Sequence, residues 1–139
     1  VHVPVAPADS SQRQRLMRFS LLVNAAADSA AALTALHTAQ ALLDTPDHQL
    51  HCLFFYRDAV HLANRHAWTG DGPQASTAQQ WQHWLARHDV NAVVCVGAAQ
   101  RRGIVATDAD NTLAEGFSLA GLGQWAEALI SSDRVIQFG

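Results

Sequence analysis

The chain has 139 residues, the size of one ordinary globular domain, and a formal net charge of −3. Hydrophobic residues make up 49% and charged residues 15%, a composition that excludes general disorder and can fill one core. The acidic balance argues against direct nucleic-acid binding. Because all nine basic residues are arginine, Schiff-base chemistry on lysine is excluded.

Residues 1–16 differ from the rest because they follow neither a helical nor a strand period. We expect a flexible leader, an expression remnant or a misjudged start there, and one folded domain over residues 17–139. The chain does not open with a basic segment followed by an apolar one, and no apolar run is long enough to span a membrane. With only two cysteines, these features favour a reducing, cytoplasmic setting.

The first predicted strand is the apolar run Phe19–Val23, and the second is Leu50–Tyr56. The helix between them should begin at the capping side chains of Asp28 and Ser29 and end at Pro46. Its apolar stripe, which we expect to face the core, contains four residues at helical spacing: Ala32, Leu36, Ala39 and Leu43.

A short helix is predicted next, over Asp58–Asn64, followed by a loop that includes Thr69–Pro73. The pattern then predicts a longer helix over Ser76–His88 and a third strand over Asn91–Val96. One face of the longer helix should enter the core through residues Trp81, Trp84, Leu85 and His88.

The last third of the chain contains an uncertain stretch, Thr107–Glu115, then a final helix and a strand over Arg134–Phe138. Five residues of the final helix share one apolar face: Leu122, Trp125, Ala126, Leu129 and Ile130. Strands separated by helices require crossover connections. The fold class is therefore α/β, a single domain whose mostly parallel, twisted sheet carries helices on both faces.

Cys95 is the strongest candidate for chemistry because it falls at the end of the third predicted strand, where open parallel sheets gather reactive groups. Thiolate is the nucleophilic form of cysteine. Charge on Arg101 or Arg102, or a helix starting near Ala98, would favour it. Gly97 would let the backbone approach a bound sulfur or oxyanion. The pattern favours nucleophilic transfer, including persulfide transfer; the alternative is a buried structural thiol.

Four further residues are weaker candidates. Arg101 and Arg102 would stabilise a persulfide anion, or else form surface or interface salt bridges. Gly103 would shape the loop that follows Cys95 or simply turn the chain there. Arg57 would line a crevice at the carboxyl ends of the strands, beside Cys95, or be an ordinary surface charge. Cys52 lies inside the second apolar run, which indicates an inert core thiol.

Other kinds of site find little support. The eight histidines lack metal-ligand spacing, and neither an HExxH nor a GxSxG motif occurs. The pair Gly121 and Gly123 lacks the third glycine of a dinucleotide motif. We therefore expect neither a metal nor a cofactor.

Five groups of segments, in order, resemble the TusD/DsrE sulfur-relay family. They are Met17–Phe19; Phe54–Val60 with Ala63–Asn64; Cys95–Val96 with Ala98–Ala99 and Arg101–Gly103; Gly116–Gly123; and Asp133–Phe138. Each is short, but together they span nearly the whole domain. The resemblance implies a DsrE-like α/β fold with flavodoxin-like layering. By motif position, it also implies that Cys95 is the cysteine that accepts sulfur as a persulfide.

The resemblance also implies partners. A small TusA-like carrier would donate sulfur and a TusE/DsrC-like protein would accept it, while TusB-like and TusC-like paralogues would complete a heterohexamer that contacts neither nucleic acid nor membrane. The sulfur would reach 2-thiouridine at the wobble position of transfer RNA or, in DsrE-type relatives, cytoplasmic sulfur oxidation. A structural subunit with an idle cysteine and a flavodoxin-like small-molecule module remain alternatives.

Three features depart from the family pattern. Asn24–Asp28 replaces a loop that is rich in glycine, proline and aromatic residues in relatives, so pocket geometry or partner choice would differ. The segment between Gly103 and Gly116 is shorter, which would alter donor docking. Residues 1–16 have no counterpart.

Overall fold

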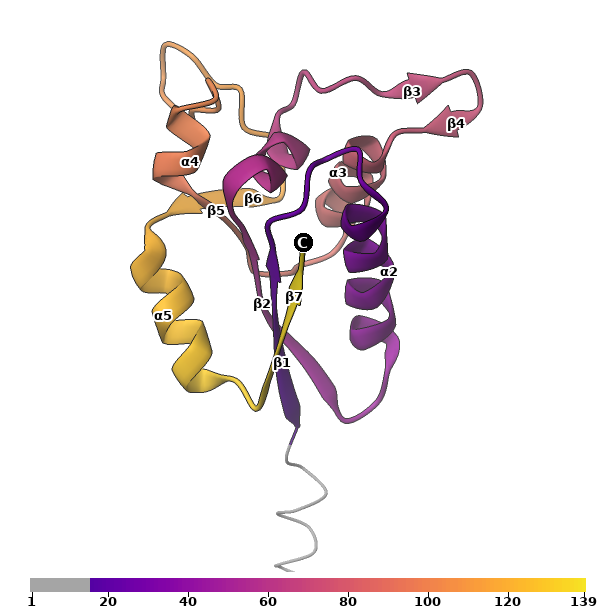
Figure 1. Cartoon of the computed structure of the whole chain (residues 1–139), viewed down its shortest axis with the longest axis vertical. Coiled ribbons are helices and arrows are strands. Elements are labelled where there is room, and N and C mark those ends of the chain that lie inside the picture. Colours follow the sequence, from indigo (N-terminus) through magenta and orange to yellow (C-terminus); the bar gives the residue numbers. More distant parts are fainter. Residues whose placement is uncertain (1–15) are drawn as a thin grey trace, which may run out of the picture.

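Five parallel strands form the central sheet of the computed structural model, which describes residues 16–139. They are β1 (Met17–Val23), β2 (His48–Phe55), β5 (Ala92–Cys95), β6 (Phe117–Ala120) and β7 (Arg134–Phe138). Their order in the sheet is β6-β5-β2-β1-β7, so the first and last strands are neighbours (Figure 1). The prediction of a parallel sheet is confirmed. The predicted leader, apart from residue 16, lies outside the described residues.

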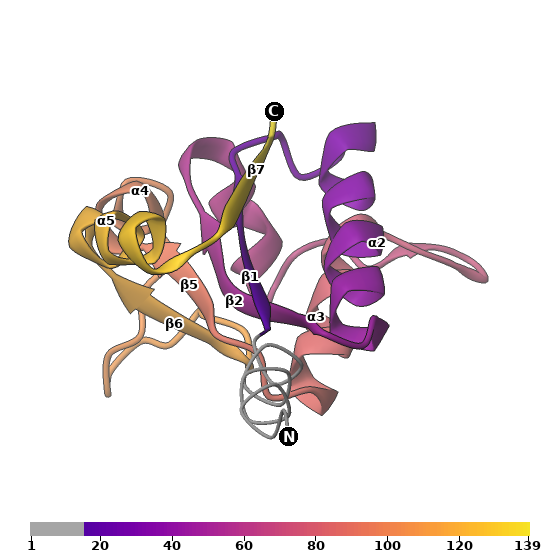
Figure 2. The ribbon, with the colours of Figure 1, turned by 90° about the horizontal axis from the view of Figure 1, so that it is seen from below.

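Helices cover both faces of this sheet, as predicted. They are α2 (Ala30–Asp44), the 3₁₀ helix η1 (Arg57–Ala63), α3 (Thr77–Arg87), α4 (Val96–Gln100) and α5 (Leu122–Ser131). Figure 2 shows α2 and α3 on one side of the sheet and α4 and α5 on the other. The predicted loop after η1 contains a two-stranded hairpin, β3 (Gly70–Asp71) and β4 (Gln74–Ala75), which projects from the domain (Figure 1).

Serine side chains begin the two longest helices. Ser29 accepts a hydrogen bond from the Ala32 amide at 3.3 Å, which confirms the predicted cap, and Ser76 accepts one from the Gln79 amide at 3.1 Å. Asp47, with φ of 68°, makes the left-handed turn that carries the chain from α2 into β2. Local polar residues thus fix where these helices start and stop.

The core is two-sided because neighbouring residues of β2 point to opposite faces. Phe55 packs against Trp81 of α3 with ring centroids 5.1 Å apart, while Phe54 packs against Trp125 of α5 at 5.7 Å. The buried indole of Trp81 also donates a hydrogen bond to the Ala32 carbonyl at 3.0 Å, which ties α3 to α2. The continuous apolar run of β2 is therefore a strand buried on both faces.

Three expectations about elements are wrong. Leu43 and His88, predicted to face the core, are exposed at the ends of their helices. The predicted apolar face of α5 also lies largely in solvent, since Ala128 is the buried residue of that helix. Its large exposed members are Leu122, Leu129 and Ile130, with 52%, 48% and 86% of their surface accessible. The pattern also missed β6, a strand of four residues.

Candidate functional site

Cys95 occupies the carboxyl end of β5 and is the residue from which α4 begins. It pairs with Ala120 of β6, and on the other side β5 pairs with β2. Only 6% of its surface is accessible. The cysteine thus lies at the carboxyl end of a strand, as the sequence predicted, but little of its surface is open to an incoming thiol.

The loop after β2 brings Arg57 to the same edge of the sheet. Arg57 has a φ of 52°, a strained left-handed conformation for a residue with a side chain, and its guanidinium lies 5.7 Å from the centre of the Tyr56 ring. The Tyr56 amide donates a hydrogen bond to the Val23 carbonyl at 2.9 Å. The loop is therefore held by backbone and ring contacts, with Arg57 exposed.

Arg101 and Gly97 lie together on the turn that follows Cys95. A Cβ atom built on Gly97 would lie 3.8 Å from Nη1 of Arg101, an ordinary contact, so packing does not require glycine there. Within residues 16–139, the exposed Arg101 guanidinium has no hydrogen bond or ion pair. Within the described residues, Arg101 shares this property with the exposed Arg57, whereas the third predicted arginine, Arg102, does not.

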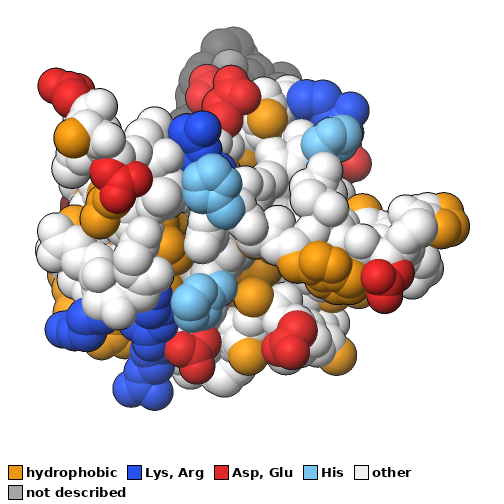
Figure 3. Space-filling model, turned by 90° about the horizontal axis from the view of Figure 1, so that it is seen from above, with side chains coloured by type: hydrophobic (Ala, Val, Ile, Leu, Met, Phe, Trp, Pro, Cys, Tyr) orange, Lys and Arg blue, Asp and Glu red, His pale blue; other side chains and the backbone are white. Residues whose placement is uncertain are grey.

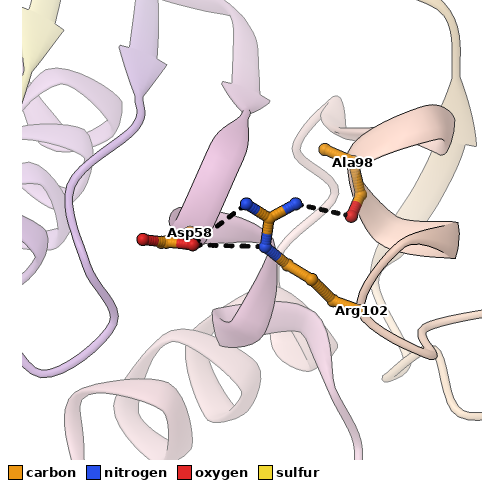
Figure 4. A network of polar contacts seen from close by, with 3 residues as sticks. All are labelled: Asp58, Ala98 and Arg102. Carbon is orange, nitrogen blue, oxygen red and sulfur yellow. Dashed lines mark hydrogen bonds and ion pairs between the residues drawn. The ribbon is translucent and has the colours of Figure 1, made fainter.

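Arg102, by contrast, is already engaged. Its Nε and Nη2 atoms donate to Oδ1 of Asp58 at 3.2 and 3.0 Å, and Nη1 donates to the Ala98 carbonyl at 2.9 Å (Figure 4). Gly103 follows with a φ of 74°, so it turns the chain at the end of α4. These two candidates shape the loop after Cys95.

Cys52 sits in a different environment. It is 2% exposed in the middle of β2, and burial raises the pKa of its thiol from 9.0 to about 11, with a smaller contribution from the negative charge of Glu127. A thiol with so high a pKa is almost entirely protonated at neutral pH and is a poor nucleophile.

A cavity of about 800 Å³ lies beside the cysteine's end of the sheet but does not include Cys95 in its lining. Its walls come from η1, the start of α2 and the β3–β4 hairpin, and they include Asp28, His61 and Trp68. Figure 3 looks onto this end: histidine side chains and an arginine lie near its middle, other arginines lie at its margins, and the hairpin projects from one side. Ala27 and Asp28 of the unusual loop after β1 thus contribute to this cavity.

Sequence reasoning missed two features around the site. It gave no role to Asp58, although this residue directly follows Arg57 in a segment that resembles the family. It also left Thr107–Glu115 unassigned, whereas backbone hydrogen bonds from Arg65 to Thr112 and from Ala114 to Ala63 hold that stretch against the end of η1.

Neither a cluster of metal ligands nor a membrane-spanning helix occurs within residues 16–139. No group of three or more His, Cys, Asp or Glu side chains in this range could hold a metal ion. No helix in the described part of the chain is long and apolar enough to cross a membrane.

Comparisons with known proteins agree with this geometry. The chain is 40% identical over 130 residues to the sulfurtransferase TusD of Salmonella arizonae. The aligned region covers 88% of this chain and all of the relative. Its fold matches the crystal structure of the ychN protein from E. coli, with a TM-score of 0.71, 25% identity and coverage of 88% of this chain and all of that one. The model of the DsrE/DsrF-like family matches residues 17–138. The predicted resemblance is therefore confirmed, and the chain belongs to the DsrE/DsrF-like family as a homologue of the sulfurtransferase TusD.

Proposed function

We propose that this protein relays sulfur as a persulfide on Cys95, on a path that leads to 2-thiouridine at the wobble position of transfer RNA. The observation that carries the proposal is the placement of Cys95 at the carboxyl end of β5, in a chain 40% identical to a sulfurtransferase. Cys52, buried within β2 and with a pKa of about 11, is a poor carrier.

The transfer needs no external oxidant. The Cys95 thiolate attacks the outer sulfur of a donor persulfide; a bond forms between Cys95 Sγ and that sulfur, and the donor's own S–S bond breaks. The donor cysteine leaves as a thiolate, and Cys95–S–SH results. An acceptor thiolate then attacks the outer sulfur and releases the Cys95 thiolate, so both steps conserve electrons.

Arg101 would stabilise the persulfide anion, because its guanidinium makes no hydrogen bond or ion pair within residues 16–139 and lies beside Gly97, two residues after Cys95. Arg57 is exposed at the neighbouring strand end and would meet the incoming protein. Arg102 keeps the loop in shape, since its donors are bound to Asp58 and Ala98.

The exposed apolar face of α5 supports assembly with other subunits. Leu122, Leu129 and Ile130, with Val135 on the edge strand β7, leave large apolar side chains in water that a paralogous TusB-like or TusC-like chain would cover. A TusA-like donor and a TusE/DsrC-like acceptor would visit the end of the sheet that carries Cys95. Such a free-thiol relay belongs in the cytoplasm. Ile130→Asp should abolish co-purification with these paralogues, whereas Asp44→Ala should not.

A structural subunit with an idle cysteine is the second candidate. Two observations favour it: Cys95 is only 6% exposed, and the α5 face is suited to assembly. Alkylation by iodoacetamide at neutral pH separates the two functions. If Cys95 relays sulfur, it should react much faster than Cys52; if it is idle, it should react as slowly as Cys52.

The direct test uses a cysteine desulfurase, a TusA-like carrier and cysteine labelled with radioactive sulfur. Label should appear on the wild-type protein and on Cys52→Ser, and should be absent from Cys95→Ser. Undiminished label on Cys95→Ser would refute the proposal. In a bacterium that lacks its own TusD, restored 2-thiouridine in transfer RNA would support this destination over sulfur oxidation.

A further inference from the structure

One side chain connects the turn after Cys95 to the neighbouring strand end. Arg102, at the end of α4, reaches Asp58 in the first turn of η1, 44 residues away in the sequence. The same guanidinium also donates a hydrogen bond to the Ala98 carbonyl of α4 at 2.9 Å. Figure 4 shows the guanidinium between the two elements, with its donors divided between them.

This contact lies close to the backbone that carries Cys95. Helix α4 has only five residues and begins at Val96, directly after the cysteine, and no side chain caps its first turn. Ala98 and Ala99 are buried, and α4 packs against η1. A short helix has little stability of its own. Its orientation, which sets the path of the chain that leaves Cys95, depends on the contacts that fasten it to η1 and to β5.

We propose that Asp58 and Arg102 are a positioning pair that holds α4 so that the Cys95 sulfur faces the donor persulfide. The inference rests on the proposed sulfur relay. Both bonds from Arg102 end on one oxygen, Oδ1, so the pair acts through directed hydrogen bonds. The planar guanidinium serves Asp58 and Ala98 together, which the single ammonium of a lysine does not.

The geometry selects the variants. Asp58→Ala removes the carboxylate that accepts both hydrogen bonds from Arg102. Arg102→Lys keeps the positive charge but loses the planar guanidinium that reaches Asp58 and Ala98 together. Both changes should disturb the position of Cys95. Asp58→Asn keeps an oxygen at the Oδ1 position and should behave like the wild type. Asp44→Ala, which removes an exposed carboxylate at the far end of α2, is the matched control.

Single-turnover sulfur loading from a persulfidated TusA-like carrier measures positioning. At saturating carrier, the loading rate should fall about tenfold in Asp58→Ala and Arg102→Lys, with the half-saturating carrier concentration unchanged. Asp58→Asn and Asp44→Ala should load at the wild-type rate. Wild-type loading in Asp58→Ala and Arg102→Lys would overturn the proposal, and so would an Asp58→Asn variant as slow as Asp58→Ala.

Alkylation by iodoacetamide, read peptide by peptide by mass spectrometry, tests the pair without sulfur transfer. Release of α4 should expose the thiol, so Cys95 should react about tenfold faster in Asp58→Ala and Arg102→Lys, while Cys52 stays slow. Equal acceleration of Cys52 would indicate general destabilisation and overturn the proposal, and so would an unchanged Cys95 rate. If the wild type takes up no sulfur but Cys95 alkylation responds as described, the proposed relay fails and the positioning pair stands.

Discussion

Burial of the Cys52 thiol makes the stability of the protein depend on pH in the alkaline range. The pKa of Cys52 rises from 9.0 to about 11 on folding, so between these values the folded chain binds more protons than the unfolded chain. A raised pKa of this kind leaves stability intact below pH 9 and removes it as the pH rises toward 11. From pH 8 to pH 10 the free energy of unfolding should fall by about 1.3 kcal/mol on this account.

Urea unfolding at pH 8, 9 and 10 measures this loss. A Cys95→Ala background leaves Cys52 as the single thiol, and Cys52→Ala on the same background removes the effect. The difference in unfolding free energy between the two proteins should change by about 1.3 kcal/mol across this range, with the thiol-containing protein losing more. Parallel pH profiles would show that Cys52 ionises in the folded chain as easily as in the unfolded chain, and would refute the reasoning.

Three further predictions concern stability and are checked by urea unfolding at neutral pH. Gly116→Ala should destabilise the protein by about 2 kcal/mol or more, because φ is 95° and the new Cβ would lie 2.8 Å from the Leu85 carbonyl oxygen, whereas Gly123→Ala, with open space around it, should stabilise by about 0.5 kcal/mol. Equal effects of the two changes would contradict this account. Trp81→Phe should cost about 2–3 kcal/mol, since it removes buried volume and the hydrogen bond to the Ala32 carbonyl, and a loss below 0.5 kcal/mol would show that the core closes around the smaller ring. Ser29→Ala should cost about 1 kcal/mol through loss of the α2 cap, and an unchanged midpoint would mean that the cap contributes nothing.

Local patterns were sufficient to predict most of the sheet and helices. The apolar run at Phe54 and Phe55 has no polar interruption, which indicated a strand covered on both faces, and Ser29 stands at an N-cap position before a helical apolar pattern. Strand β6 alternates Phe117-Ser118-Leu119-Ala120, which is a strand signal, but four residues are too few to stand out.

Periodicity also does not show whether an apolar helix face packs against the core or is exposed on the surface. The face of α5 has the spacing of a core helix, yet Ile130 is 86% exposed because that side of the helix turns away from the sheet. The same limit applies at the site. The position of Cys95 followed from the end of a strand, but the contact between Asp58 and Arg102 joins residues 44 apart, and such a pairing arises only from tertiary packing.

The order of the strands has a consequence for synthesis of the protein. Strand β1 lies between β2 and β7, so one of its two edges is completed by the strand of the sheet that is synthesised after the other four. Until Arg134–Phe138 emerges, the nascent chain carries an open strand edge next to Leu21, a residue that is fully covered in the finished domain. A ribosome stalled before residue 134 would therefore display an intermediate that is prone to aggregate, and cotranslational chaperones would have to protect this edge until β7 emerges.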